Sequence, residues 1–582
     1  MTKRACDGCR RRKVKCDAKS PQCSNCFMST LTCEFTVAPK KRGPPFRARR
    51  GAHKRTSQSG SNDELPLHNN TAMPLLGTPD GGGSASISTT ASLPAVSPGN
   101  NVSVGGETAP DFYGKPPFRV AIDDLLSALG MALPYVPLED VISTCIDLFM
   151  QWEFPSIPVV CEPLLRRSIH VVVPVLRDET PGRPISDMIP TLRAFALLTA
   201  LCAVVSAVLP PEIFPSGVAL SMPFLRTSRE ALRLYQDLDI EQPDSSSIII
   251  RYFHSNALHA LGKTRVSFHA MGEALRLVQE MRLYDESSFQ GLEWPENHLR
   301  RNTFWHLYIG DKSASILNQV PITLHQICLD TPITTHFDES QACGLMQPEG
   351  PDTVVFEGQL RLCFHLCFRL WYTASEMLLD LNLLSRLQGS SRRRAITLSS
   401  TAAEPDDVPS SLRTSTMQSY LDFTSILQSC PAWLRDPGAA VPDGVGETTA
   451  RFRTRAISVQ KANLFITFHA LRLVLLSRFS ERGFADVLGL TGDPVMLAMR
   501  KVEIAGDLLD AVSDMPFEAL QANGEPCVEK LRQVGVALLE IIHNVSSEVI
   551  SARARSLFGT LLDVLARLNS KVSDELSNDC ES

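Results

Sequence analysis

The sequence lacks a continuous apolar segment long enough to cross a membrane. Its longest apolar run, at residues 194–209, has 16 residues and includes Thr199 and Ser206, whereas a membrane-spanning helix needs about 20. Because Pro210 and Pro211 follow the run and proline ends helices, we predict a buried core helix. The first residues, MTKRACDGC, contain no apolar stretch. We therefore expect no secretory signal, no membrane partner and a location on the cytosolic and nuclear side.

Signatures of common catalytic sites are also missing. The patterns HExxH, GxSxG and GxGxxG do not occur, so we assign no catalytic residue and expect no enzyme. A Gly-Lys-Thr triplet at residues 262–264 is not a phosphate-binding loop, because the glycine required five positions earlier is Ala257. We interpret it as a break between helices. Three histidines show no zinc-type pairing with acids and are expected to be structural: His254, His259 and His269.

The cysteines do not follow the pattern of a small secreted disulfide scaffold. Of 16 cysteines, six lie between residues 6 and 33 and ten are scattered through the rest of the chain. Scattered cysteines are usually small buried side chains in a reducing compartment, so we expect no disulfides. The sequence also has no repeat with a period of 20–50 residues, which argues against a solenoid.

The charge of the chain is divided between its two ends. Residues 1–55 hold 16 Lys and Arg against three acids, a charge of +13, while the whole chain carries −6. The remainder therefore carries −19. A basic end on an acidic body is typical of a chain that binds a polyanion at one end.

Composition divides the chain into five segments. Residues 1–35 hold the cysteine cluster, residues 36–55 form a basic extension, and residues 56–112 predict a disordered linker, because Ser, Gly, Pro and Thr dominate there. Residues 113–500 predict a large all-α regulatory domain, and residues 501–582 a helical C-terminal region. The expected fold is a small two-zinc cluster domain with two short helices, a flexible linker and the all-α body.

Helical periodicity carries the prediction for the body. Apolar residues recur at helical spacing with no sustained strand-like alternation, most clearly at Leu464, Phe465, Phe468, Leu471 and Leu475. Polar stretches at 389–412 and 435–447 are interpreted as loops within the body.

The six N-terminal cysteines form two copies of one unit. The pattern C-x2-C-x6-C occurs twice, and a shift of 17 residues maps the first copy onto the second; the cysteines are Cys6, Cys9, Cys16, Cys23, Cys26 and Cys33. Zinc takes four thiolates in a tetrahedron. Two separate tetrahedra need eight sulfurs, but six suffice if two sulfurs bridge the metals. The repeat suggests Cys6 and Cys23 as the bridging pair. An iron–sulfur site is the alternative.

The cluster resembles the fungal zinc binuclear cluster family of transcription factors. Residues 6–17 read CDGCRRRKVKCD, which matches the family pattern of two cysteines, a basic run, and a third cysteine followed by Asp. The resemblance implies two structural zinc ions per chain, with Cys6 and Cys23 bridging and Pro21 turning the loop between the halves. It also implies that the short helix after Cys9 enters the major groove of double-stranded DNA, where Lys13 reads a CGG-like triplet.

The basic residues support this interpretation independently of the family. Five of the six residues 10–15 are basic, and such side chains contact phosphate or guanine edges. We assign mainly phosphate contacts to Arg10, Arg11, Arg12 and Lys15, with Arg12 also a helper in the groove. The second half, CSNCFMSTLTC, has no basic residue. The basic extension is interpreted as a nuclear localisation signal that could also contact DNA: Lys40, Lys41, Arg42, Arg47, Arg49 and Arg50.

A second resemblance lies within the body. Residues 301–321 are similar to the fungal transcription factor regulatory domain, or middle homology region, which has an Arg-x3-Trp helix followed by an aspartate; here these are Arg301, Trp305 and Asp311. We expect the aromatic residues around Trp305 to be core. Residues 36–110 contain no heptads, so no coiled coil is predicted, and dimerisation stays open.

The function expected from these features is sequence-specific regulation of RNA polymerase II transcription in the nucleus. Expected partners are DNA and the transcription machinery or co-regulators, and a small-molecule effector is left open. A secondary-metabolite gene cluster is favoured over carbon-source use. The alternative is a zinc-dependent interaction scaffold without sequence-specific DNA binding. Acids and apolar residues at 508–518 fit either an acidic activation segment or a packed amphipathic helix; the acidic tail at 573–582 is a further candidate.

Overall fold

The computed structural model describes part of the chain in two compact units, which comprise residues 1–106 and 107–582. The described residues are 6, 9, 16–18, 22–23, 26, 33–34, 116–177, 185–325, 332–335, 344–348, 352–397, 410–441 and 444–568. Those of the second unit, here called the helical body, form helices and connecting loops without a strand. This confirms the all-α prediction. The expected linker, residues 56–112, lies outside the described residues.

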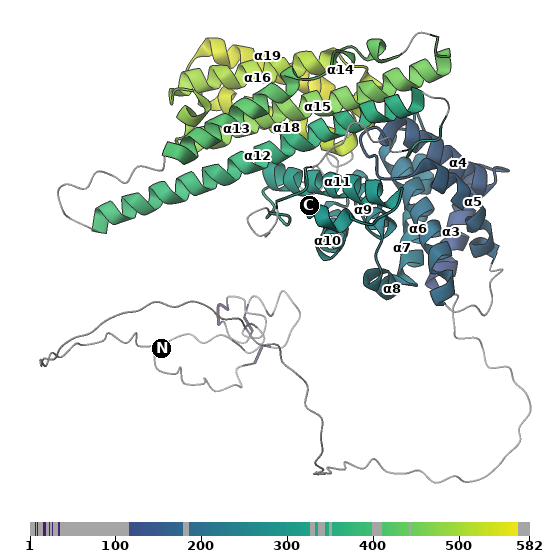
Figure 1. Cartoon of the computed structure of the whole chain (residues 1–582). Coiled ribbons are helices and arrows are strands. Elements are labelled where there is room, and N and C mark those ends of the chain that lie inside the picture. The colour runs from purple at the N-terminus through teal and green to yellow at the C-terminus, as the bar shows by residue number, and fades with distance from the viewer. Residues whose placement is uncertain are drawn as a thin grey trace, which may run out of the picture. The chain divides into compact units, whose positions relative to one another are not determined.

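The first half of the helical body is a set of helices joined mostly by short loops (Figure 1). They are α3 (Pro117–Ala132), α4 (Leu138–Leu148), the π-helical turn η1 (Phe149–Glu153), α5 (Glu162–Arg177), α6 (Ile185–Val208), α7 (Gly217–Arg233), α8 (Gln236–Glu241), α9 (Ser245–Ala260), α10 (Thr264–Glu280), the 3-10 turn η2 (Glu286–Phe289) and α11 (Glu296–Asn318). Local signals set their ends. Asp244 and Ser247 form a capping box at the start of α9.

The Gly-Lys-Thr triplet separates α9 from α10, as predicted. Gly262 has φ +77°, a left-handed conformation that glycine adopts without strain, and α10 begins at Thr264. The backbone N–H of Lys263 donates to the carbonyl of Leu258 at 2.9 Å, which closes the C-terminal end of α9.

The second half is a layer of long helices. Its elements are α12 (Asp352–Thr397), α13 (Ser410–Gln428), α14 (Ala432–Arg435), the 3-10 turn η4 (Pro437–Ala440), α15 (Glu447–Glu481), the 3-10 turn η5 (Ala485–Leu488), α16 (Pro494–Ser513), α17 (Phe517–Ala522), α18 (Gly524–Asn544) and α19 (Glu548–Leu568). In Figure 1, α12, α13, α15 and α16 run side by side, and these neighbours pack in pairs. The division expected between residues 500 and 501 falls inside α16.

The predicted loop at residues 389–412 is wrong at both ends. Helix α12 continues through residue 397 and α13 begins at Ser410; residues 398–409 lie outside the described residues. The prediction relied on the missing apolar face. Residues 389–397, GSSRRRAIT, contain no proline, however, and arginine and alanine favour helix. A helix that continues from a packed segment needs no apolar stripe of its own.

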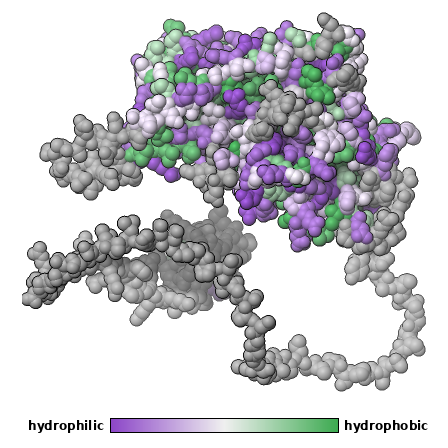
Figure 2. All heavy atoms as spheres, in the orientation of Figure 1, coloured by the Kyte–Doolittle hydropathy of each residue, from purple (hydrophilic) through white to green (hydrophobic). Residues whose placement is uncertain are grey.

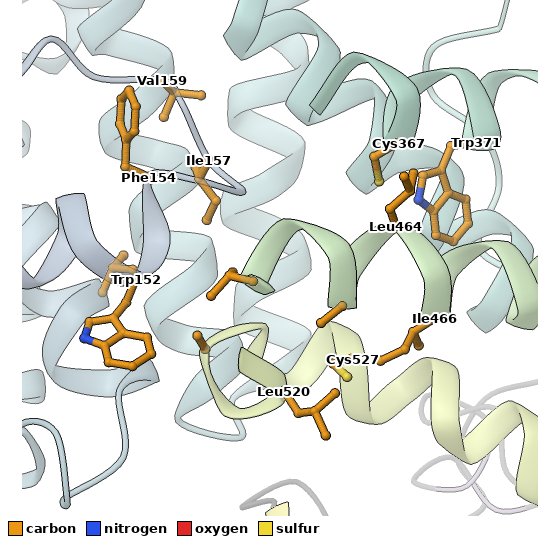
Figure 3. Packing of buried hydrophobic residues seen from close by; sticks show 14 of the residues in the cluster. Trp152, Phe154, Ile157, Val159, Cys367, Trp371, Leu464, Ile466, Leu520 and Cys527 are labelled. Carbon is orange, nitrogen blue, oxygen red and sulfur yellow. The ribbon is translucent and has the colours of Figure 1, made fainter. Parts of the chain in front are cut away.

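One main apolar core joins the two halves of the body. Its members run from α3 to α19, and Figure 3 shows part of it, with Trp152 and Ile157 from the first half near α15 and α17 of the second. Described cysteines of the body belong to this core as free, buried thiols, for example Cys367 and Cys527. No described cysteine forms a disulfide.

The longest apolar run lies in α6 and is a core helix, as predicted. Among the described residues, α6 and α15 are long and apolar enough to cross a membrane, but their most apolar windows are 72% and 67% buried. Six consecutive residues, 200–205, are fully buried. The face of the body drawn in Figure 2 mixes hydrophilic and hydrophobic residues rather than carrying an apolar belt.

Candidate metal centre

The six cysteines of the N-terminal unit gather in one cluster. Four of them are fully buried, Cys6, Cys9, Cys23 and Cys26, and Cys16 and Cys33 are partly buried. Cys9 and Cys26, the second cysteine of each copy, are both helical. The remainder of the two short helices expected there lies outside the described residues.

Contacts within the cluster repeat with the period of the sequence. The backbone N–H of Cys6 donates to the sulfur of Cys16 at 3.5 Å, and 17 residues later the N–H of Cys23 donates to the sulfur of Cys33 at 3.3 Å. The N–H groups of Cys9 and Cys26 likewise donate to the first sulfur of their own copies, both at 3.4 Å. The two copies therefore have the same local fold.

The sulfurs lie at the spacing that zinc requires. Cys6 and Cys23 are 3.7 Å apart at Sγ, and the crossed pairs Cys6–Cys26 and Cys9–Cys23 are both 3.5 Å apart. Zinc binds thiolate sulfur at about 2.3 Å, so two sulfurs on one tetrahedral ion lie about 3.8 Å apart. The observed distances fit that edge, and the six clustered cysteines can bind two zinc ions.

Two overlapping groups of four sulfurs exist within the cluster. One comprises Cys6, Cys9, Cys16 and Cys23; the other comprises Cys6, Cys23, Cys26 and Cys33. Within each group, all ligand atoms lie within 4.8 Å of one another. The groups share Cys6 and Cys23, the two residues that the count of ligands and the repeat selected as the bridging pair.

Hydrogen bonding and burial act in opposite directions on these thiols. The N–H of Cys9 lowers the pKa of Cys6 to about 6, while burial raises the pKa of Cys26 to about 12. A divalent cation favours the thiolate at every position because it replaces the thiol protons. Four thiolates on each ion leave no position for water, so zinc here would crosslink the chain and would not catalyse.

Residues 4–42 match the family model described as the fungal Zn(2)-Cys(6) binuclear cluster domain. This part of the chain belongs to that family, which confirms the resemblance inferred from the cysteine spacing.

Two similar proteins match beyond the cluster. A citrinin biosynthesis transcriptional activator of Monascus ruber is 27% identical over 349 residues, which is 57% of this chain and 63% of the relative; its counterpart from Monascus purpureus has the same identity and is covered to 56%. The chain thus spans about 56–63% of the length of these relatives. An ABC-transporter-regulating transcription factor of Aspergillus oryzae is 55% identical over 42 residues, which is 7% of this chain and 5% of the relative. These are names of transcription regulators, not of enzymes.

The basic residues assigned to DNA and to nuclear import lie outside the described residues. They are Arg10, Arg11, Arg12, Lys13 and Lys15 in the cluster, and Lys40, Lys41, Arg42, Arg47, Arg49 and Arg50 in the extension. Their roles stay predictions. Within the family match, residues 4–42, lie the five basic residues of the cluster and the first three of the extension.

The Arg-x3-Trp segment is part of α11 and is buried. Arg301 donates two hydrogen bonds of 2.6 Å to the carboxylate of Glu286. Asp311 accepts from the backbone N–H groups of residues 323–324 at 2.9 and 3.0 Å. The ring nitrogen of Trp305 donates to a backbone carbonyl at 3.1 Å. The segment therefore fixes the loops around α11, and the expectation that its aromatic residues are core is confirmed.

The histidines singled out in the sequence do not share a site. His254 is 4% exposed and its Nε2 lies 2.7 Å from the hydroxyl of Ser228, and burial lowers its pKa to about 3. His269 lies 3.4 Å from Glu273 on the surface of α10. His259 lines a cavity of the body. The sequence reasoning did not single out Glu153, a buried acid in that cavity, although a lone acid between Trp152 and Phe154 is a usable signal.

Proposed function

We propose that this protein is a DNA-binding regulator of RNA polymerase II transcription that acts in the nucleus. The observation that carries the proposal is the six-sulfur cluster, which has two overlapping zinc-type groups in a segment that belongs to the fungal binuclear cluster family. The relatives named as transcriptional activators support it, since their match extends over 57% of the chain. The +13 charge of residues 1–55 suits a polyanionic partner.

The base-reading part of this proposal rests on the first half of the cluster. Lys13 would donate to guanine O6 and N7 in a CGG-like triplet, and Arg10, Arg11, Arg12 and Lys15 would mainly contact phosphates. The metal ligands on either side, Cys9 and Cys16, would hold this basic run in position. Zinc itself would supply only the crosslinks.

Binding to short duplexes tests the base-reading role. With zinc-loaded full-length protein, Lys13→Ala is expected to lower affinity for a CGG duplex about 5- to 150-fold, and to lower affinity for a scrambled duplex much less. Arg10→Ala should weaken both duplexes alike and reduce the salt slope by about 1. Lys19→Ala, in the loop between the two halves, is the matched control. An unchanged sequence preference in Lys13→Ala would contradict the assignment, and no DNA binding at any salt concentration would favour the interaction scaffold.

Nuclear import is assigned to the basic extension. Replacing Lys40, Lys41 and Arg42 by alanine should leave DNA binding by the purified protein largely intact and shift a fluorescent fusion toward the cytoplasm. Nuclear accumulation equal to that of the unmodified fusion would place the signal elsewhere.

A secondary-metabolite gene cluster is the proposed target. The support is the name of the two Monascus relatives, activators of citrinin biosynthesis. Genome-wide mapping of bound sites checks this directly: enrichment at the promoters of one biosynthetic cluster is expected, and enrichment at sugar-transport promoters instead would contradict it.

A further inference from the structure

A cavity of about 230 Å³ lies where the two halves of the helical body meet. Its walls come from η1 and α9–α11 in the first half, and from α12, α15, α17 and α18 in the second. Apolar side chains dominate the lining, among them Ile157, Met271, Ile309, Leu317 and Trp371. Figure 3 shows Ile157 and Trp371 on the two sides of this region. The volume is below the ~300–1,000 Å³ of sites for drug-sized ligands, so one small ring system fits.

One end of the cavity carries polar atoms without a partner. Glu153 is 3% exposed, and its Oε1 accepts no hydrogen bond from any described residue. The hydroxyl of Ser156 and Nδ1 of His306 are equally buried and unpartnered within the described part of the chain. The other ring nitrogen of His306 lies 2.6 Å from the hydroxyl of Tyr252, which fixes the ring. Three such atoms from two separate elements converge on one cavity.

The opposite wall carries a buried ammonium group. Lys530 is 6% exposed and donates to the amide oxygen of Asn463 at 3.0 Å, but it forms no ion pair with a described carboxylate. The two glutamates that line the same cavity, Glu525 and Glu529, each lie 3.5 Å from Arg532 instead. The ammonium charge of Lys530 thus lacks a compensating anion.

Both features cost stability when they face no ligand. A buried polar atom without a hydrogen bond and a buried charge without a partner are among the expensive arrangements in a protein interior. They persist mainly where function requires them, as in ligand sites with a few convergent polar groups in an apolar pocket.

We propose that this cavity binds a small carboxylic acid with an apolar, ring-sized body, and that the acid regulates the protein. The carboxylate would pair with Lys530, and a hydroxyl or carbonyl at the other end would bond Glu153, Ser156 or His306. The regulatory part rests on the proposed function, whereas binding of the acid does not.

The charges distinguish an acid from other small molecules. A protonated amine would meet the ammonium of Lys530, and a neutral amide would leave that charge uncompensated. At the other end, burial raises the pKa of Glu153 to about 8, so at neutral pH its carboxyl group is protonated and can donate to a ligand oxygen.

The experiment uses three probes that differ in one group: 4-hydroxybenzoate, 4-hydroxybenzamide and 4-hydroxybenzylamine. Calorimetric titration of the zinc-loaded full chain should show saturable binding of the acid, at least about 10-fold tighter than the amide, and no measurable binding of the amine. Comparable affinity for the amide or the amine, or no saturation by the acid at millimolar concentration, would overturn the proposal.

Variants tie the binding to the cavity. Lys530→Met should reduce the affinity for the acid to that for the amide, while Lys501→Met, a buried lysine paired with Glu540 at 3.3 Å outside the cavity, should leave it within about twofold. Glu153→Gln keeps a donor and should bind within about twofold; Glu153→Leu should bind several-fold more weakly. Equal binding by Lys530→Met and wild type would contradict the site.

Two further measurements keep the outcomes separate. Ile309→Trp fills the cavity and should abolish binding of the acid, which provides a test if Lys530→Met does not fold. Affinity for a CGG duplex is measured in the same samples without the acid. Loss of acid binding with normal DNA binding would overturn only the ligand proposal, and acid binding without DNA binding would overturn only the proposed function.

Discussion

The cysteine cluster and the helical body keep their folds by different means. In the cluster, the buried side chains are the cysteines themselves, and a segment this short buries too little apolar surface to fold without metal. In the body, a continuous apolar core runs from α3 to α19. The two regions should therefore respond to different perturbations, the cluster to loss of zinc and the body to loss of packing or of buried ion pairs.

Removing zinc should separate the two regions most sharply. A strong chelator is expected to abolish binding to a CGG duplex, because structural zinc supplies most of the folding free energy of such a cluster. The helical signal of the body and its thermal transition should change little. Circular dichroism and a DNA-binding assay on the same sample measure both, and cooperative unfolding of the body on chelation would contradict the comparison.

Single cysteine variants should show which sulfurs are shared. Cys23→Ser removes a member of both groups of four and should prevent stable binding of either zinc, whereas Cys33→Ser removes a member of one group and should leave about one zinc per chain. Cys430→Ser, a buried cysteine of the body, should retain both. Zinc analysis of purified protein measures the difference; equal losses in Cys23→Ser and Cys33→Ser would argue against bridging.

Breaking a buried ion pair should destabilise the body and spare the cluster. Asp239 is fully buried and accepts from Arg251 at 2.6 Å, so Asp239→Ala should lower the free energy of unfolding by about 3–5 kcal/mol, because Arg251 is left buried without its partner. The control is Asp124→Ala, which breaks an exposed pair with Arg226 of 2.5 Å and should cost less than about 1 kcal/mol. Denaturant unfolding provides the numbers, and zinc content should stay unchanged.

The smallest effect expected is a gain of stability at Glu153. Burial raises the pKa of this acid from 4.5 to about 8, so the folded protein holds a proton that the unfolded chain releases, and stability falls as the pH rises through this range. Glu153→Gln removes that dependence. The variant should match wild type near pH 5 and be more stable by about 2 kcal/mol near pH 8. Glu212→Gln, on an exposed turn, should show no such trend in thermal denaturation; a wild-type profile that rises from pH 5 to pH 8 relative to Glu153→Gln would contradict the assignment.

Sequence patterns predicted the cluster well because its ligands are local. Cys6 and Cys9 belong to one short turn, and a repeat of 17 residues relates them to Cys23 and Cys26, so spacing alone contains the geometry. The helical body was predictable as a class for the same reason, since periodicity reports a buried face. The continuation of α12 through residue 397 was not predictable this way, because that stretch shows no apolar face.

The cavity could not be predicted because its walls come from distant parts of the chain. Glu153 and Lys530 are separated by almost the whole body in sequence, and neither belongs to a motif. The acidic-apolar segment at 508–518 shows the same limit. Its pattern fitted an activation segment or a packed helix, and the structure places Leu508, Leu509 and Val512 in the core on α16, which favours the packed helix. The acidic tail lies outside the described residues.

The central claim is that six sulfurs hold two zinc ions by sharing two of them. Native mass spectrometry of the folded, full-length protein measures this most directly, since it counts the metal ions bound to each chain. We predict two zinc ions per chain, both lost together in Cys6→Ser as well as in Cys23→Ser. A single zinc ion per wild-type chain would contradict the account.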